Sequence, residues 1–326
     1  MKVVSLFAGA GGLDLGFKNT SGFVLTWAND NDPDAVRTYN TNFGGGCVLA
    51  DISTIASSEI PDADIVLGGF PCQGFSVANT GRRSDDARNA LYLQMLRVIE
   101  AKRPLAFVAE NVKGLTYMED GEVLRRIVQD FELAGYDVVW KILNAADYGV
   151  PQRRERVFIV GLRKDLRAQF RYPEPTHSNE RDTGLPQWVS VGQALMPLPD
   201  PDLHHTLSNH TYSKYKLRFN GYLGHRMIDP DKPAPTITAR GDNRGGVVVL
   251  HHPSNERRMS VRELATVQSF PLDFFFDCNQ SAAYRLIGNA VAPRVAEAVA
   301  TALRSALLAA GSTFAEGVSV EARERS

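Results

Sequence analysis

The sequence predicts an α/β protein built on a mostly parallel, doubly wound sheet, with a second, smaller, loop-rich domain. Two observations predict this fold class. Short apolar runs alternate with longer helical periods through the first half of the chain, and this alternation stops after residue 162. Strands that alternate with helices form parallel sheets covered on both faces, whereas a stretch without either period is typical of loops.

The predicted elements follow one another closely along the first half. Strands are expected at 2–7, 23–28, 48–50, 65–67, 105–109, 138–143 and 157–162, and helices at 13–18, 90–101 and 122–133. Helical periodicity returns at 261–269 and 293–308. The polar tail from residue 309 onward is expected to fray.

Proline, histidine, asparagine and glycine gather between the two helical regions. Residues of these types punctuate loops, so this part is expected to form the smaller domain. The predicted division is 1–167 for the first domain, 168–258 for the smaller one, 259–310 for a return segment that completes the first, and 311–326 for a frayed tail.

Composition indicates a globular protein with a large core. The chain has 326 residues, of which 44% are hydrophobic and 22% charged, which is ordinary for soluble domains. No apolar stretch is long enough to span a membrane. The three cysteines, Cys47, Cys72 and Cys278, show no metal-type spacing, which favours free thiols in a reducing cytoplasm and no metal site. A net charge of −1 gives no overall sign of nucleic-acid binding, so that case depends on local clusters.

Glycines and carboxylates follow the first three predicted strands. Gly9, Gly11 and Gly12 come after the first strand, Asp30 after the second and Asp51 after the third. Ligands of open parallel sheets bind beyond the carboxyl ends of the strands. A glycine-rich turn alone is also found in ordinary tight turns, but the ordered series predicts a site for an adenosine-containing cofactor.

The residue at position 14 separates two kinds of cofactor. A dinucleotide site has a third glycine where this chain has Asp14. A carboxylate is a poor neighbour for a pyrophosphate. It suits a cationic or zwitterionic ligand, and this predicts S-adenosylmethionine, which carries a sulfonium and no phosphate.

Three segments carry groups able to do chemistry. Cys72 lies at the exposed end of an apolar run, where a nucleophile or a small buried residue would both be reasonable. Glu110 ends another strand, where burial would raise its pKa, although such residues are often caps or turns. Arg154 and Arg156 alternate on an extended segment and so share one face, unless they belong to a solvated charge run.

The motifs, taken together, resemble those of the bacterial cytosine-5 DNA methyltransferases of restriction–modification systems. They occur in that family's order and cover nearly the whole chain except about 168–255. The matching stretches are 7–12 (Phe-Ala-Gly-Ala-Gly-Gly), 71–73 (Pro-Cys-Gln), 110–112 (Glu-Asn-Val), 152–156 (Gln-Arg-Arg-Glu-Arg), 262–271 and 288–293 (Gly-Asn-Ala-Val-Ala-Pro).

The resemblance implies the Rossmann-like fold of S-adenosylmethionine-dependent methyltransferases and roles for particular residues. Cys72 would add as a thiolate to carbon 6 of cytosine, while Glu110 keeps the ring neutral. Arg156 would approach the carbonyl oxygen of the base, with Arg154 and Asn111 supporting the site. The implied contacts of S-adenosyl-L-methionine are Phe7, Gly9, Gly11, Gly12, Asp30, Asn31, Asp51, Ile52, Phe70, Asn289 and Ala290.

The implied partner is double-stranded DNA, from which the target cytosine must be flipped out. Residues 76–89 would form a loop that closes over the DNA, and 168–258 would be a target-recognition domain that reads base edges. The expected DNA contacts are Gln73, Ser76, Arg82, Arg88, Thr236, Arg240 and Arg244. The resemblance further implies a bacterial cytoplasmic monomer that works beside a cognate restriction endonuclease.

One departure and two alternatives remain at this stage. Where the family often has an aromatic residue that stacks on adenine, this chain has Asn31, so either the cofactor is bound more weakly or Phe7 and Phe70 supply the apolar contacts. An RNA methyltransferase of the same fold, as in the tRNA-acting branch, is the first alternative, although the Cys-Phe-Thr element of that branch is absent. The second is a DNA-binding module without activity, against which the presence of Cys72, Glu110, Arg154 and Arg156 argues.

Overall fold

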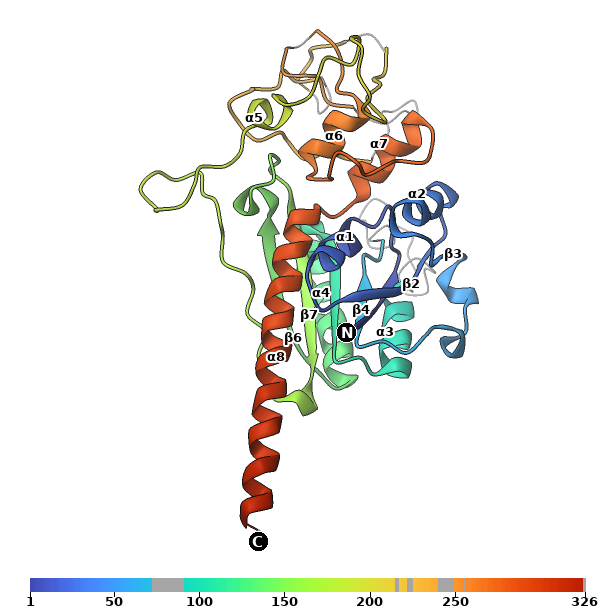
Figure 1. Cartoon of the computed structure of the whole chain (residues 1–326), viewed down its shortest axis with the longest axis vertical. Coiled ribbons are helices and arrows are strands. Elements are labelled where there is room, and N and C mark those ends of the chain that lie inside the picture. Colours follow the sequence, from blue (N-terminus) through green and yellow to red (C-terminus); the bar gives the residue numbers. More distant parts are fainter. Residues whose placement is uncertain (72–90, 215–216, 222–224, 240–248, 255, 325–326) are drawn as a thin grey trace.

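The computed structural model describes residues 1–71, 91–214, 217–221, 225–239, 249–254 and 256–324, with the backbone alone for 311–324. A seven-stranded sheet with the order β3-β2-β1-β4-β5-β7-β6 forms the body of the molecule (Figure 1). The strands are β1 Lys2–Leu6, β2 Val24–Asp30, β3 Cys47–Leu49, β4 Ile65–Gly68, β5 Ala106–Val112, β6 Tyr136–Asn144 and β7 Glu155–Arg163.

Strand directions confirm the predicted mostly parallel sheet. In the sheet order β3-β2-β1-β4-β5, each strand pairs with the next in parallel. The strand β7 runs antiparallel to both of its neighbours, β5 and β6. The central strands β1, β4 and β5 are buried almost throughout, as expected for parallel strands covered on both faces. The sheet is therefore mixed because of one reversed strand.

The strand β5 is longer than the sequence pattern predicted. Glu110 and Asn111 were expected to follow it, but both lie inside it, opposite Phe158 and Val157 of β7. These two polar residues stay extended because they continue to pair with β7 after the apolar run has ended.

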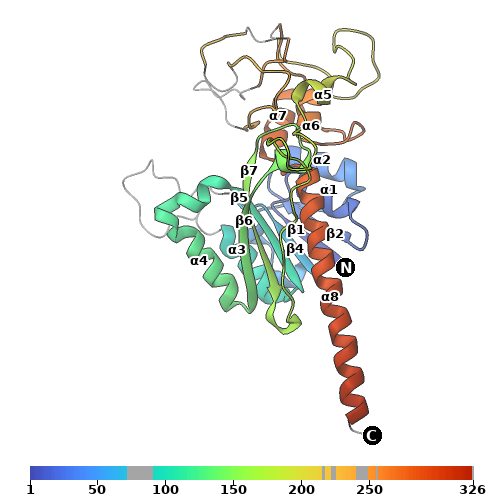
Figure 2. The ribbon, with the colours of Figure 1, turned by 90° about the vertical axis from the view of Figure 1, so that its left-hand side faces the viewer.

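Helices cover both faces of the sheet (Figure 2). On one side lie α1 (Gly12–Asn19) and α8 (Pro293–Glu324), and on the other lie α3 (Leu91–Lys102) and α4 (Glu122–Leu133). Alternate strand residues enter the two cores, because successive side chains of a strand point to opposite faces. Thus Val3 packs in the cluster with α1 and α8, whereas Val4 packs in the cluster with α3 and α4.

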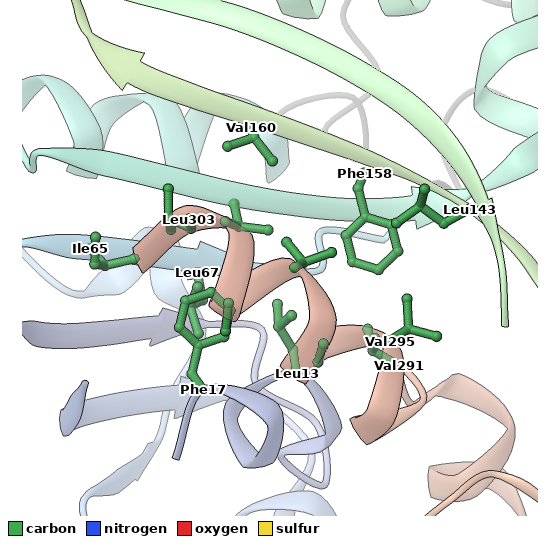
Figure 3. Packing of buried hydrophobic residues seen from close by; sticks show 14 of the residues in the cluster. Leu13, Phe17, Ile65, Leu67, Leu143, Phe158, Val160, Val291, Val295 and Leu303 are labelled. Carbon is green, nitrogen blue, oxygen red and sulfur yellow. The ribbon is translucent and has the colours of Figure 1, made fainter. Parts of the chain in front are cut away.

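The helix α8 brings the end of the chain back onto the first elements. Val295 and Leu303 of α8 pack with Leu13 and Phe17 of α1 and with Leu67 of β4 (Figure 3). The helix continues to Glu324, past residue 308 where the sequence pattern predicted its end.

The smaller part lies beyond the carboxyl edge of the sheet (Figure 1). Its helix α5 (Val191–Leu195) shares one hydrophobic cluster with α6 (Val261–Val267) and α7 (Gln280–Asn289) of the return segment and with residues from the loops before them. The return segment therefore packs on the smaller part through α6 and α7, and on the sheet through α8. The division of the chain at residue 258 stays a prediction.

The remaining elements are short, apart from α2. The helix α2 (Pro33–Phe43) packs beside β2 and β3. The 3₁₀ helices are η1 Ile52–Thr54, η2 Ser57–Glu59, η3 Lys113–Gly121, η4 Ala145–Tyr148 and η5 Lys164–Leu166. Among the residues whose placement the structure gives, no helix has the length and apolarity of a membrane span.

Replacing Leu303 by alanine is expected to destabilise the fold. Its side chain is fully buried between α1 and the sheet, so the substitution leaves a cavity and should lower the free energy of unfolding by about 2–5 kcal/mol. Urea denaturation measures this. Leu133→Ala is the control, because that leucine is 78% exposed; equal losses for the two variants would contradict the packing of α8.

Candidate active site

The reversed strand β7 delivers two arginines to the edge where the parallel strands end. Because β7 is antiparallel to β5, its first residues lie beside the last residues of β5, and Arg156 is paired with Val112. Glu110 is two residues earlier on β5. The ion pair between Arg156 Nε and Glu110 Oε1 measures 3.1 Å.

The carboxyl group of Glu110 is buried and only partly satisfied. The residue is 8% exposed, and Glu110 Oε1 makes no hydrogen bond despite its ion pair. Burial raises the pKa of Glu110, although the charge of Arg156 opposes this. A buried polar atom without a hydrogen-bond partner is rare in proteins and is often found where a ligand binds.

Asn111 ties the end of β4 to β5. Its Nδ2 donates to the carbonyl oxygen of Phe70 at 2.9 Å, and its Oδ1 accepts from the N–H of Val112 at 2.8 Å. Asn111 therefore acts as a clamp on Phe70, while its supporting role at the site stays a prediction. Pro71, the last described residue before 72–90, follows this clamp directly.

Arg154 is buried and joins separate segments. It is 2% exposed. One of its Nη groups donates to the carbonyl oxygen of Ile237 at 2.8 Å, and the other donates to those of Gly288 and Ala290 at 2.8 and 2.9 Å. Arg154 therefore holds the strand β7 against both the smaller part and the return segment, whereas Arg156 meets the carboxyl group.

Two glutamine side chains strengthen this junction. Gln152 and Gln268 are fully buried, and the amide of Gln152 donates to that of Gln268. The side-chain oxygen of Gln152 accepts from the N–H of Ile237 at 3.0 Å, and Gln268 Nε2 donates to the carbonyl of Ala290 at 2.6 Å. Sequence reasoning gave Gln268 no role, because its contacts come from segments far apart in the chain.

The predicted cofactor residues gather along the ends of β1, β2 and β3. Asp30 accepts hydrogen bonds from the N–H groups of Gly9 at 2.8 Å and Asp32 at 2.9 Å, and its own carbonyl accepts from the N–H of Ala50 at 3.1 Å. A side chain at Gly9 would point into open space. By contrast, a Cβ at Gly12 would lie 2.3 Å from the carbonyl oxygen of Val291, so Gly12 permits close packing of the return segment.

The other residues of this edge differ in exposure. Asp51 is exposed and accepts hydrogen bonds from the N–H and the hydroxyl of Ser53, which lower its pKa. Asn31 is also exposed. Ile52, Phe70 and Ala290 are buried, Phe7 is partly buried, Asn289 is exposed at the end of α7, and Gly11 precedes α1 with a φ of 81°.

Asp14 points into the core, so the argument from its charge to S-adenosylmethionine has no support in its position. Its carboxylate is fully buried, and it accepts hydrogen bonds from Ser5 Oγ at 3.0 Å and from Tyr39 Oη at 2.9 Å. Its two hydrogen bonds join the first turn of α1 to β1 and to α2. Its charge therefore gives no reason to prefer a cationic cofactor, and Tyr39, its partner from α2, carried no local signal in the sequence.

Several predicted site residues lie outside the described part of the chain. They are Cys72, Gln73, Ser76, Arg82, Arg88, Arg240 and Arg244. Thr236 is described: its hydroxyl donates to the carbonyl oxygen of Arg153 at 2.7 Å.

Comparisons with known proteins agree with one another. Residues 1–305 match the family model of the C-5 cytosine-specific DNA methylase. The type II methyltransferase M.NgoFVII of Neisseria gonorrhoeae is 40% identical over 90% of this chain and 83% of its own length. The type II methyltransferase M.BsuRI of Bacillus subtilis is 37% identical over 92% of this chain and 78% of its own.

Solved structures resemble the whole chain. A putative DNA modification methyltransferase encoded within an E. coli prophage superposes with a TM-score of 0.74 at 26% identity, over 94% of this chain and 99% of that one. The S. pombe Dnmt2 methyltransferase, at 20% identity and a TM-score of 0.66, covers 94% of this chain and 99% of its own and shares the fold.

The buried carboxyl of Asp14 predicts a particular pH dependence. Burial raises its pKa from 3.8 to about 6, so the folded state holds this proton more tightly than the unfolded chain. Its contribution to stability is complete at low pH and is lost as the pH rises from about 4 to about 6. Relative to Asp14→Asn, the wild type should lose about 3 kcal/mol of unfolding free energy over that window.

Denaturant titrations at a series of pH values measure this difference. Asp62→Asn serves as the control, because the Asp62 side chain is 94% exposed. A wild-type curve parallel to that of Asp14→Asn would show that Asp14 keeps its ordinary affinity for protons.

Proposed function

Because this chain belongs to the C-5 cytosine-specific DNA methylase family, we propose that it takes its methyl group from S-adenosylmethionine, with Cys72, Glu110 and Arg156 carrying the transfer. The observation that supports this most directly is the buried Glu110–Arg156 ion pair, in which Glu110 Oε1 makes no hydrogen bond. The relatives named as type II methyltransferases favour DNA over tRNA as the substrate.

The residues along the carboxyl edge of the sheet fit S-adenosylmethionine. When bound, this cofactor supplies a methyl group on a positively charged sulfur. The open space beside Gly9 leaves room for a ligand, and the carboxylate of Asp30 has lone pairs left to accept hydrogen bonds from ribose hydroxyls. Asp51, which is exposed, can accept a hydrogen bond from an adenine amino group.

The proposed nucleophile is Cys72. Its thiolate would add to carbon 6 of a flipped-out cytosine, which turns carbon 5 into an enamine-like centre able to accept the methyl group. Loss of the proton from carbon 5 and departure of the thiolate would then restore the aromatic ring. The clamp of Asn111 on Phe70 supports this assignment, because two residues of chain reach at most about 7 Å from Phe70.

Glu110 would hold the ring neutral as sulfur adds. Its raised pKa favours the protonated carboxyl, which donates to ring nitrogen 3, while Arg156 beside it faces the carbonyl oxygen of the base. Hydrogen-bond donors placed where charge develops contribute more in a buried site than in water. Arg154 would touch no substrate and would act through the position of β7.

The biological setting is proposed from the relatives. We propose a bacterial cytoplasmic monomer that methylates one duplex DNA sequence and protects host DNA beside a cognate restriction endonuclease. Residues 168–258 would act as the target-recognition domain, with 76–89 as the loop over the DNA. Bisulfite sequencing of plasmid DNA from cells that express the protein would reveal the recognition sequence.

Duplex DNA that carries 5-fluorocytosine in the recognition sequence should trap the enzyme covalently. Fluorine cannot leave carbon 5 as a proton does, so the bond to Cys72 persists after methyl transfer. A slower band in a denaturing gel reports the adduct. Cys72→Ser should abolish it and Cys278→Ser should keep it; an adduct that survives Cys72→Ser would remove Cys72 from the mechanism.

Glu110→Gln should leave DNA binding intact and slow methyl transfer by about 10² to 10⁴. Glutamine has the shape of glutamate, but it has no carboxyl proton to place on the ring. Single-turnover transfer of labelled methyl groups measures the rate, with Glu132→Gln on the surface of α4 as the control. A rate within about threefold of the wild type would exclude Glu110 as the proton-bearing group.

A further inference from the structure

An outward-facing arginine lies between the buried residues that enter β7. Gln152 is fully buried and Arg154 is 2% exposed, whereas Arg153 between them is exposed. Side chains of an extended segment alternate between its two faces. Burial of both neighbours therefore fixes the direction of Arg153 toward solvent.

The backbone of Arg153 is held on both sides. Its N–H donates to the carbonyl oxygen of Ala234 at 2.9 Å, and its carbonyl oxygen accepts from the hydroxyl of Thr236 at 2.7 Å. The N–H of Ala234 in turn donates to the carbonyl oxygen of Pro151 at 2.9 Å. These hydrogen bonds to the smaller part hold the backbone around Arg153 in place and leave its side chain exposed to solvent.

Arg153 takes no part in the ion pair that its neighbour on the same face makes. Two residues later on the same face, Glu155 pairs with Lys113 at 2.9 Å. Arg153 has no ion-pair partner among the residues that the structure describes. An uncompensated guanidinium on a fixed backbone is suited to a phosphate, which it binds through two parallel hydrogen bonds.

The position of Arg153 relative to Glu110 and Arg156 indicates which phosphate of the DNA it would contact. Arg153 and Arg156 are three positions apart on the extended segment, a span of about 10 Å. Under the proposed function, a flipped base that meets Glu110 would bring the phosphates that flank it to the same edge of the sheet. We propose that Arg153 binds a backbone phosphate next to the flipped nucleotide, an inference that depends on the proposed function.

The same geometry changes the role expected of Thr236. A hydroxyl has one proton, and that of Thr236 is given to Arg153, so it has none to donate to a phosphate. Thr236 is then a positioning residue that acts on the DNA through Arg153.

Salt dependence of DNA binding tests the proposed phosphate contact. Fluorescence anisotropy with a labelled duplex gives the slope of log K against log salt, to which each neutralised phosphate contributes about 0.9. Arg153→Gln should reduce the steepness of the slope by that amount and weaken binding roughly tenfold at low salt. Arg153→Lys should keep the slope. The control is Arg167→Gln, which follows β7 and η5 at the opposite end of the sheet.

Steady-state kinetics and a double-mutant cycle complete the test. Arg153→Gln should raise KM for DNA and leave kcat and KM for S-adenosylmethionine unchanged. Thr236→Val should weaken DNA binding, Thr236→Ser should not, and the effects of Thr236→Val and Arg153→Gln should be non-additive because they act on one contact. Additive effects would mean that Thr236 touches DNA independently.

The outcomes separate this inference from the function on which it depends. Suppose that the protein binds and methylates DNA and that Arg153→Gln shows the same salt slope as the wild type. The phosphate contact would then be overturned, and the methyltransferase assignment would stand. Failure of the wild-type protein to bind duplex DNA or to methylate it would remove both.

Discussion

The reversal of β7 within an otherwise parallel sheet is the constraint on which the site depends. A parallel β7 would begin at the opposite edge, far from the carboxyl ends of β4 and β5. Because it runs antiparallel, its first residues arrive where β5 ends. One register then places Arg156 beside Glu110 and turns Arg154 toward three carbonyl groups of other segments.

Much of the fold could be predicted from local patterns. The apolar runs located the seven strands within a few residues, and α4 begins and ends where its period did. The hydrogen-bond partners could not be predicted in this way. Arg154 meets carbonyls that are 83 to 136 residues away in the chain, and such partners follow from packing of separate segments, which no window of sequence contains.

The errors have the same origin. Asp14 occupies the position where a dinucleotide site has glycine, but whether its side chain faces the ligand depends on Ser5 and Tyr39, which capture it from behind. Glu110 was placed after its strand because the apolar run stops, yet pairing with β7 keeps it extended. In both cases a contact between elements overrode the local sequence pattern. The type of residue could be read from the sequence, but the direction in which its side chain points could not.

The helix that closes one face of the sheet follows all seven strands in the chain. Val295, Val299 and Leu303 fill the layer over β1 and β4, so a nascent chain that has already made every strand still carries one uncovered apolar surface. Contacts between segments this distant in sequence form slowly, since a long loop must first close. This core therefore forms only after α8 has been made, and until then the uncovered surface over β1 and β4 is prone to aggregation.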